Sequence, residues 1–120
     1  MKLIKVLNAR QVLDGLSDRG DISSHLSYWM TKFVAKTENE QQFYASEMRK
    51  LLDEYAEYKE GEPLHVPVEK ASAFSEAVEE LNNTDVEDPG IRFCLSELTS
   101  EIKLSMQQMY PLLDFIDENK

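Results

Sequence analysis

The stretch from residue 22 to residue 59 constrains the fold most, because it contains neither glycine nor proline. Apolar residues recur within it at steps of three and four, as they do on one face of an α-helix. The spacing predicts a long helix, either continuous or made of two helices end to end, which Gly61 and Pro63 stop. Residues 36–42 are polar on every face, which indicates a break or a crossing through solvent. The apolar positions are Ile22, Leu26, Trp29, Met30, Phe33, Tyr44, Met48, Leu51, Leu52, Tyr55 and Tyr58.

Two shorter elements are predicted before this helix. Residues 2–6 alternate weakly between lysine and branched apolar residues, which favours a short strand. Asn8 is a good N-cap for a helix over residues 9–17, and Gly20 suits the chain reversal that follows. The apolar face of that helix would consist of Val12, Leu13 and Leu16.

Shorter elements are also expected after the long helix. Residues 63–68 alternate between polar and apolar but contain two prolines, so they form at most a short edge strand. Residues 70–81 have helical periodicity and predict a third helix. The turn signal Asp88-Pro89-Gly90 is compatible with a small β-hairpin between Val86 and residues 91–93.

The C-terminal part predicts a final short helix. Ser105 and Gln108 have the spacing of a capping box, in which each side chain satisfies the backbone N–H of the other residue. Pro111 interrupts or kinks what begins there. The apolar residues that would close the core are Leu112, Leu113, Phe115 and Ile116.

These elements predict a helix-dominated α+β fold. It would contain a long helical hairpin, two or three short strands or a small β-hairpin, and a short C-terminal helix. A chain of 120 residues is long enough for one core, so residues 1–120 are expected to form a single domain.

The chain is expected to act in the cytoplasm. Its N-terminal apolar run is too short for a signal peptide and is broken by Lys5. No stretch approaches the roughly 20 apolar residues of a membrane span. The single cysteine, Cys94, cannot form an internal disulfide, and its apolar neighbours predict a small buried side chain; a reactive thiol is the alternative.

The charge is strongly negative, −10 in total, and most of it lies in the second half of the sequence. Residues 1–60 carry a net charge of −1 and residues 61–120 a net charge of −9. Such a surface repels phosphate backbones, so direct binding of nucleic acid is not expected. The two interpretations left open are a face for a basic partner and a charge that only keeps the protein soluble.

The sequence offers little for catalysis, and we expect no enzymatic activity and no cofactor. His25 and His65 are the only histidines, and each is predicted to be a surface or packing residue. No spaced Cys/His set, calcium loop or phosphate-binding glycine loop occurs. Three glutamates lie at helical spacing without the Glu-x-x-His partner of di-metal bundles, so a solvated helix face is the preferred interpretation and an acidic binding face the alternative. They are Glu76, Glu79 and Glu80.

Aromatic residues on the long helix are the best candidates for a binding surface. The consecutive residues Tyr28, Trp29 and Met30 point in three directions around a helix, so one core cannot accept them all. Aromatic residues and methionine are enriched at protein interfaces. A protein partner or a second copy is therefore expected on this surface, with core packing as the alternative. The candidate residues are Tyr28, Trp29, Phe33, Phe43 and Tyr44.

A series of short motifs extends over nearly the whole chain. They are Leu7–Leu13, Ile22–Lys32, Leu51–Tyr55, Gly61–Leu64, Phe74, Leu81–Val86, Leu95–Leu98, Leu104–Ser105 and Pro111–Ile116. In this order they resemble a family of small proteins of unknown function encoded by phages and prophages of bacteria. The resemblance implies a phage or prophage origin in a bacterial host cell, and it carries over no activity and no site residues.

Three functions are consistent with these observations. The leading hypothesis is an accessory or adaptor protein that binds a phage or host protein, or a second copy of itself. The second is an acidic mimic of nucleic acid that inhibits a host or defence enzyme, which requires Glu76, Glu79, Glu80, Glu87 and Asp88 to form one continuous face. The third is a virion-assembly chaperone.

Overall fold

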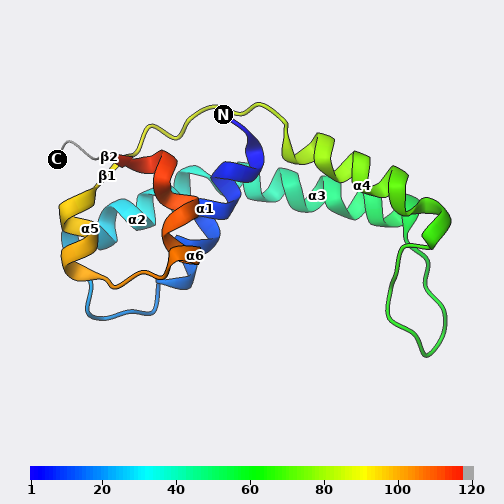
Figure 1. The fold of residues 1–120 in the computed structure, drawn as a ribbon, viewed down its shortest axis with the longest axis horizontal. Coiled ribbons are helices and arrows are strands. Elements are labelled where there is room, and N and C mark those ends of the chain that lie inside the picture. The colour runs from blue at the N-terminus through cyan, green and yellow to red at the C-terminus, as the bar shows by residue number, and fades with distance from the viewer. Residues whose placement is uncertain (118–120) are drawn as a thin grey trace.

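Most of residues 1–117 lie in helices, which confirms a helix-dominated α+β fold (Figure 1). The structure is a computed structural model and describes residues 1–117. Two short strands pair near the C-terminal side. The elements are α1 (Leu3–Gly15), α2 (Ser24–Lys36), α3 (Glu38–Tyr55), α4 (Val68–Asn82), β1 (Phe93–Cys94), α5 (Leu95–Glu101), α6 (Met106–Met109), the 3-10 helix η1 (Tyr110–Phe115) and β2 (Ile116–Asp117).

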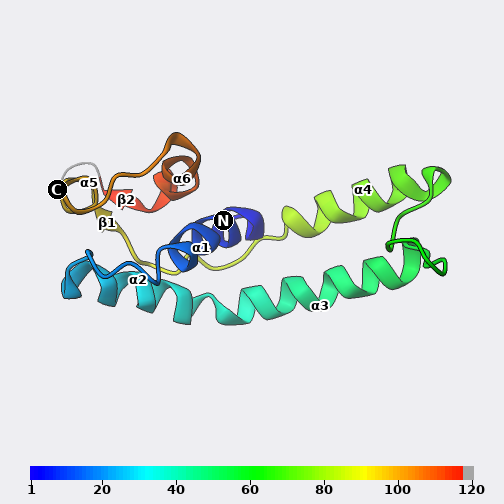
Figure 2. The ribbon, with the colours of Figure 1, turned by 90° about the horizontal axis from the view of Figure 1, so that it is seen from below.

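The long helical stretch consists of two helices end to end, α2 and α3, with a single non-helical residue between them (Figure 2). This residue, Thr37, is fully buried, and its hydroxyl donates to the carbonyl of Phe33 at 2.8 Å. Lys36 is the last residue of α2 and Glu38 the first residue of α3. The positive charge therefore lies at the negative C-terminal end of one helix dipole, and the negative charge lies at the positive N-terminal end of the other. The polar middle predicted from the sequence is therefore a break between two helices.

The chain divides in space into a body and an arm. The arm is residues 38–82, which contain α3, the loop 56–67 and α4; the body is residues 1–37 and 83–117. The two helices of the arm lie side by side and extend away from the body (Figure 1). The radius of gyration is 17.4 Å, whereas a compact domain of this length has roughly 14 Å. The projecting arm accounts for the elongated shape of 50 × 32 × 24 Å.

The short strand predicted over residues 2–6 is wrong, because this segment forms the first turns of α1. Its apolar residues fall on two sides of one helix, and this produces the weak alternation in the sequence. Val6, Ala9 and Leu13 face the body core, whereas Leu3 and Leu7 face Leu81 at the base of the arm. The helix α1 thus lies between two apolar clusters, which is possible only because apolar residues cover more than one of its faces.

The body core is built from α1, α2 and the C-terminal elements. Leu26, Met30 and Phe33 occupy one face of α2 and are buried. The ring of Phe33 packs edge-on against Phe115 at a centroid distance of 4.9 Å, and Phe93 lies beside it at 6.2 Å. Residues 91–115 therefore return to cover the helices α1 and α2.

The strands differ from the hairpin suggested by Asp88-Pro89-Gly90. The turn exists, with Gly90 at a φ of 77°, but β1 pairs in parallel with β2, Phe93 beside Ile116. Parallel strands need a long connection, and here it contains α5, α6 and η1. Residues 63–68 contribute only one isolated bridge, between Glu57 and His65.

The predicted helices after the arm loop are confirmed in outline. The third helix occupies Val68–Asn82, slightly longer than the predicted 70–81. The capping box is present: Ser105 accepts from the Gln108 N–H at 3.2 Å, and Gln108 accepts from the Ser105 N–H at 3.0 Å. The final helix consists of α6 followed by η1, since Pro111 lies at the start of the 3-10 segment.

Candidate functional site

The negative charge of the protein is concentrated in the arm. Residues 38–82 contain twelve acidic and four basic side chains, a net charge of −8 out of −10 for the whole chain. The sequence placed most of the charge in residues 61–120, but in space the acidic residues of α3 and α4 come together. The body is close to neutral, so the electrostatic field of the molecule originates mainly in the arm.

The arm also lacks a covered core. No residue of α3 is buried, and Leu81, at the base, is the only buried residue of α4. Tyr55 and Phe74 contact each other edge-on near the far end, with ring centroids 6.0 Å apart, and both remain half-buried. Two helices alone cannot enclose apolar side chains, because each leaves one side of the contact open to water. The arm therefore presents apolar surface that nothing in residues 1–117 covers.

A groove lies between the two helices of the arm near its base and has a volume of about 250 Å³. Phe43, Glu47 and Leu51 recur at every fourth position of α3 and form one wall. Phe43 is 45% exposed and Leu51 is half-buried. The opposite wall consists of Ala77, Glu80, Leu81 and Thr84.

Each wall of this groove carries a carboxylate. Glu47 pairs with Lys50 of its own helix at 3.0 Å, and both side chains are partly exposed. Glu80 is exposed on α4, one helical turn from Glu76, and Glu79 is exposed beside it. Among the ion pairs of residues 1–117, none involves these three glutamates of α4. Of the three predicted acidic candidates, Glu80 therefore lines the groove, and Glu76 lies one helical turn away on the same side of α4.

The five aromatic candidates do not form one surface. Phe33 is fully buried in the body core, because it lies two turns from Leu26 and one turn from Met30 on the inner face of α2. Tyr28 and Trp29 lie on the outer face, 56% and 38% exposed, with their rings edge-on at 5.3 Å. The ammonium group of Lys32 lies 5.7 Å from the Tyr28 ring centroid, a weak cation–π contact. The structure thus leaves Tyr28 and Trp29 as one exposed pair.

Phe43 and Tyr44 are adjacent in sequence but face different parts of the molecule. Phe43 lines the groove of the arm. Tyr44 is half-buried and packs against the apolar cluster of Leu3, Leu7 and Leu81. Neighbouring residues of a helix point about 100° apart, so one core cannot hold both rings.

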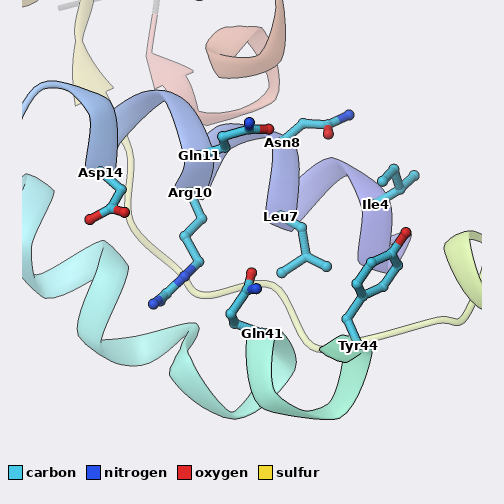
Figure 3. Close-up of a pocket in the computed structure, with 8 residues that line it drawn as sticks. All are labelled: Ile4, Leu7, Asn8, Arg10, Gln11, Asp14, Gln41 and Tyr44. Carbon is cyan, nitrogen blue, oxygen red and sulfur yellow. The ribbon is translucent and has the colours of Figure 1, made fainter. Parts of the chain in front are cut away.

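Tyr44 also lines a second hollow, of about 510 Å³, between α1 and α3 (Figure 3). Arg10 is its only basic side chain, and the hydrogen bonds of Arg10 are already formed within the protein. Its guanidinium donates to the Val34 carbonyl, to Thr37 Oγ1 at 3.1 Å and to Glu38 at 2.5 Å. The remaining polar groups are Asn8, Gln11, Asp14 and Gln41. We therefore assign Arg10 a structural role at the junction of α2 and α3, which the sequence interpretation missed because Arg10 sits on a polar helix face.

The other side chains considered for chemistry are placed as follows. His25 is exposed, and its Nδ1 lies 2.7 Å from a carboxylate oxygen of Glu97. Residues 1–117 hold no group of three or more His, Cys, Asp or Glu arranged to bind a metal ion. Within the same residues no helix is both long and apolar enough to span a membrane.

Cys94 is only partly buried, which corrects the buried position expected from its apolar neighbours. Side chains alternate along a strand, and since Phe93 points into the core, Cys94 points the other way. Its Sγ lies 3.1 Å from the hydroxyl of Ser96. This hydrogen bond, together with one from the backbone N–H of Glu97, lowers the pKa of the Cys94 thiol.

Comparisons with protein-family models, with curated proteins and with solved structures find no match to this chain. The functional argument therefore rests on the geometry and charge of the arm.

Proposed function

We propose that this protein is a phage- or prophage-encoded accessory or adaptor protein that binds another protein through its arm. It would act in the cytoplasm of the bacterial host without catalysis or a cofactor. The order of the sequence motifs supports the origin. The observation that carries the binding role is the arm itself, whose helices leave apolar residues half-exposed beside Glu80, which forms no ion pair within residues 1–117. Most helices in proteins are stabilised by packing of their apolar face, so a partner that covers the arm would stabilise it.

The proposal is tested by affinity purification of the full chain from bacterial cells, followed by cross-linking through lysine residues. The arm carries Lys50, Lys59 and Lys70, and lysines of the body serve as the internal comparison: Lys2, Lys5, Lys32, Lys36 and Lys103. We expect a co-purified protein whose cross-links are concentrated on the arm lysines. Recovery of no protein, or cross-links confined to the body lysines, would contradict the proposal.

The second candidate function, an acidic mimic of nucleic acid that inhibits an enzyme, is supported by the concentration of charge in the arm. Its acidic face would comprise Glu76, Glu79 and Glu80. Glu87 and Asp88, which the sequence analysis included in this face, would lie outside it. Asp88 pairs with Arg92 at 2.6 Å, and Glu87 and Asp88 line a hollow together with Lys36. A charge-led complex should weaken strongly when the ionic strength rises, because salt screens exposed charges. A complex that persists unchanged at high salt would count against this function.

A homodimer held by two arms is disfavoured by their charge, since each arm carries a net charge of −8. We therefore expect any self-association to use the exposed pair Tyr28 and Trp29 of the body.

A further inference from the structure

The groove of the arm has the pattern that a helix requires of its binding site. Helices of binding partners place apolar residues at steps of three and four into a hydrophobic groove between two helices. Here the apolar lining is supplied by Phe43 and Leu51 from α3 and by Ala77 and Leu81 from α4. Phe43 is the outermost of these, 45% exposed, so its ring is available for contact.

The rim of the groove specifies the charge of the occupant. Glu47 lies on one wall and Glu80 on the other, and Glu76 is exposed one helical turn before Glu80 on the same side of α4. The Lys50 partner of Glu47 is 69% exposed and belongs to the same helix, so this pair contributes little and can be rearranged. An occupant with basic residues on both sides of an apolar stripe would pair with both rims.

The fold already contains one contact of this kind. The helix α1 carries two basic side chains, Lys5 and Arg10, and one acidic side chain, Asp14, and it packs against the base of the arm. Leu3 and Leu7 pack on Leu81, while Arg10 pairs with Glu38 at 2.5 Å. The helix α1 covers the Tyr44 and Met48 side of α3. Phe43 and Glu47 each precede those residues by one position, so they lie about 100° around the helix and remain uncovered.

We infer that the arm groove binds a basic amphipathic α-helix of the partner protein, which lies on Phe43 and Leu51 between Glu47 and Glu80. This inference rests on the proposed function and names the chemistry of its partner. A second copy of the chain does not fit, because the apolar residues of its helix α1 are already buried in its own fold and its arm is acidic. The bound helix converts the two-helix arm into a three-helix arrangement with an enclosed core.

The test uses the full chain and a synthetic helical peptide as long as α3, 18 residues, with leucine at steps of three and four and lysine elsewhere. One control peptide has the same composition in an order without the apolar stripe, and another has glutamate in place of lysine. Binding is measured by fluorescence anisotropy of the labelled peptides at about 150 mM salt, where exposed charges more than about 8 Å apart are largely screened. We expect the striped basic peptide to bind and both controls to bind at least about tenfold more weakly.

Three variants locate the site. Glu80→Lys and Phe43→Ser should each weaken binding of the striped peptide about tenfold. Glu60→Lys, in the exposed loop of the arm, makes the same charge change as Glu80→Lys and should alter binding less than about twofold. Circular dichroism of each variant checks that the helices remain. Equal losses for Glu60→Lys and Glu80→Lys, equal binding of the reordered peptide, or no binding at all would overturn the inference.

The outcomes separate this inference from the function on which it rests. If a partner is cross-linked to the arm but the basic peptide does not bind, the adaptor function is supported and the inference of a basic helical ligand is refuted. Peptide binding in the groove without any arm-bound partner in cells would refute the adaptor function. A dimer in sedimentation that Glu80→Lys abolishes would assign the groove to a second copy and overturn the inference.

Discussion

The Nη2 group of Arg10 in α1 donates to the carboxylate of Glu38, the first residue of α3, at 2.5 Å. The same guanidinium donates to the Val34 carbonyl and to Thr37 Oγ1 at 3.1 Å. One side chain thus joins α1 to the last turn of α2, to the break and to the start of α3. The direction of the arm relative to the body depends on this junction.

Replacing Arg10 by alanine should therefore lower the free energy of unfolding by about 1–3 kcal/mol, because it removes hydrogen bonds that involve a charged group and are largely shielded from water. Glu38 is 50% exposed, so Glu38→Gln should cost less than about 1 kcal/mol. Chemical denaturation of both variants measures the difference. Equal effects of the two substitutions would show that the salt bridge alone, and not the buried contacts, matters at the junction.

Substitution of a buried and of an exposed aromatic residue should differ clearly in its effect on stability. Phe33 is fully buried among Phe93 and Phe115, so Phe33→Ala should destabilise the protein by about 3–5 kcal/mol. Phe43 is 45% exposed, and Phe43→Ala should cost about 1 kcal/mol or less. Thermal or chemical unfolding of the two variants provides the measurement. A large loss for Phe43→Ala would mean that its ring supports the fold of the arm.

Phe33 and Phe43 also show which features of the fold could be predicted from the sequence and which could not. Periodicity predicted the helical stretch and the helix of residues 70–81, because these features depend on local spacing. It left open whether the stretch is interrupted, and it placed the end near residue 59, whereas α3 ends at Tyr55. On the sequence alone Phe33 and Phe43 have the same status, since both are candidates for an aromatic binding surface on the long helix. Which face is covered depends on residues distant in sequence: Phe115 returns to cover Phe33, and nothing in residues 1–117 returns to cover Phe43.

The wrong predictions, a strand over residues 2–6 and a β-hairpin near residue 90, also arise because contacts between distant segments decide the structure there. Residues 2–6 resemble a strand because α1 packs on two sides, and a helix between two clusters loses the simple one-face pattern. The parallel pairing of Phe93 with Ile116 joins segments that share no local turn signal. The acidic character was evident from composition, but its concentration in the arm required the pairing of α3 with α4 to be known.

Asp88 provides a pH-dependent contribution to stability. The guanidinium of Arg92, with help from the Gly90 N–H, lowers the pKa of Asp88 to about 2. Because the pKa in the folded state lies below the value of about 3.9 in unfolded chains, this carboxylate stabilises the fold above pH 4 and loses its effect as the pH falls towards 2. Asp88→Asn retains the oxygen that accepts from Gly90 and removes the charge.

The variant Asp88→Asn should be less stable than the original protein by about 1 kcal/mol or less at pH 7, since the ion pair is largely exposed. The difference should shrink between pH 4 and pH 2. Urea unfolding at a series of pH values follows it. A difference that is independent of pH would attribute the effect to packing instead of charge.

Cys94 should react with alkylating reagents at lower pH than an ordinary thiol. The hydrogen bond with the Ser96 hydroxyl and the N–H of Glu97 lowers its pKa, and the thiolate is the reactive form. The pH profile of the alkylation rate is the measurement, and its midpoint should lie below that of a free cysteine. Ser96→Ala should move the midpoint upward. An unchanged midpoint in that variant would show that the hydroxyl does not stabilise the thiolate.

Hydrogen exchange should separate the arm from the body. Local stability follows the number of buried apolar contacts, and α3 contains no buried residue, whereas α1 contains five: Leu3, Val6, Leu7, Ala9 and Leu13. Backbone amides of residues 48–55 and 70–78 should therefore exchange faster than those of α1. Mass spectrometry of exchanged peptides resolves these segments without any substitution. Equal protection of arm and body would mean that the two-helix arm is stable without a partner, and it would remove the main reason for expecting one.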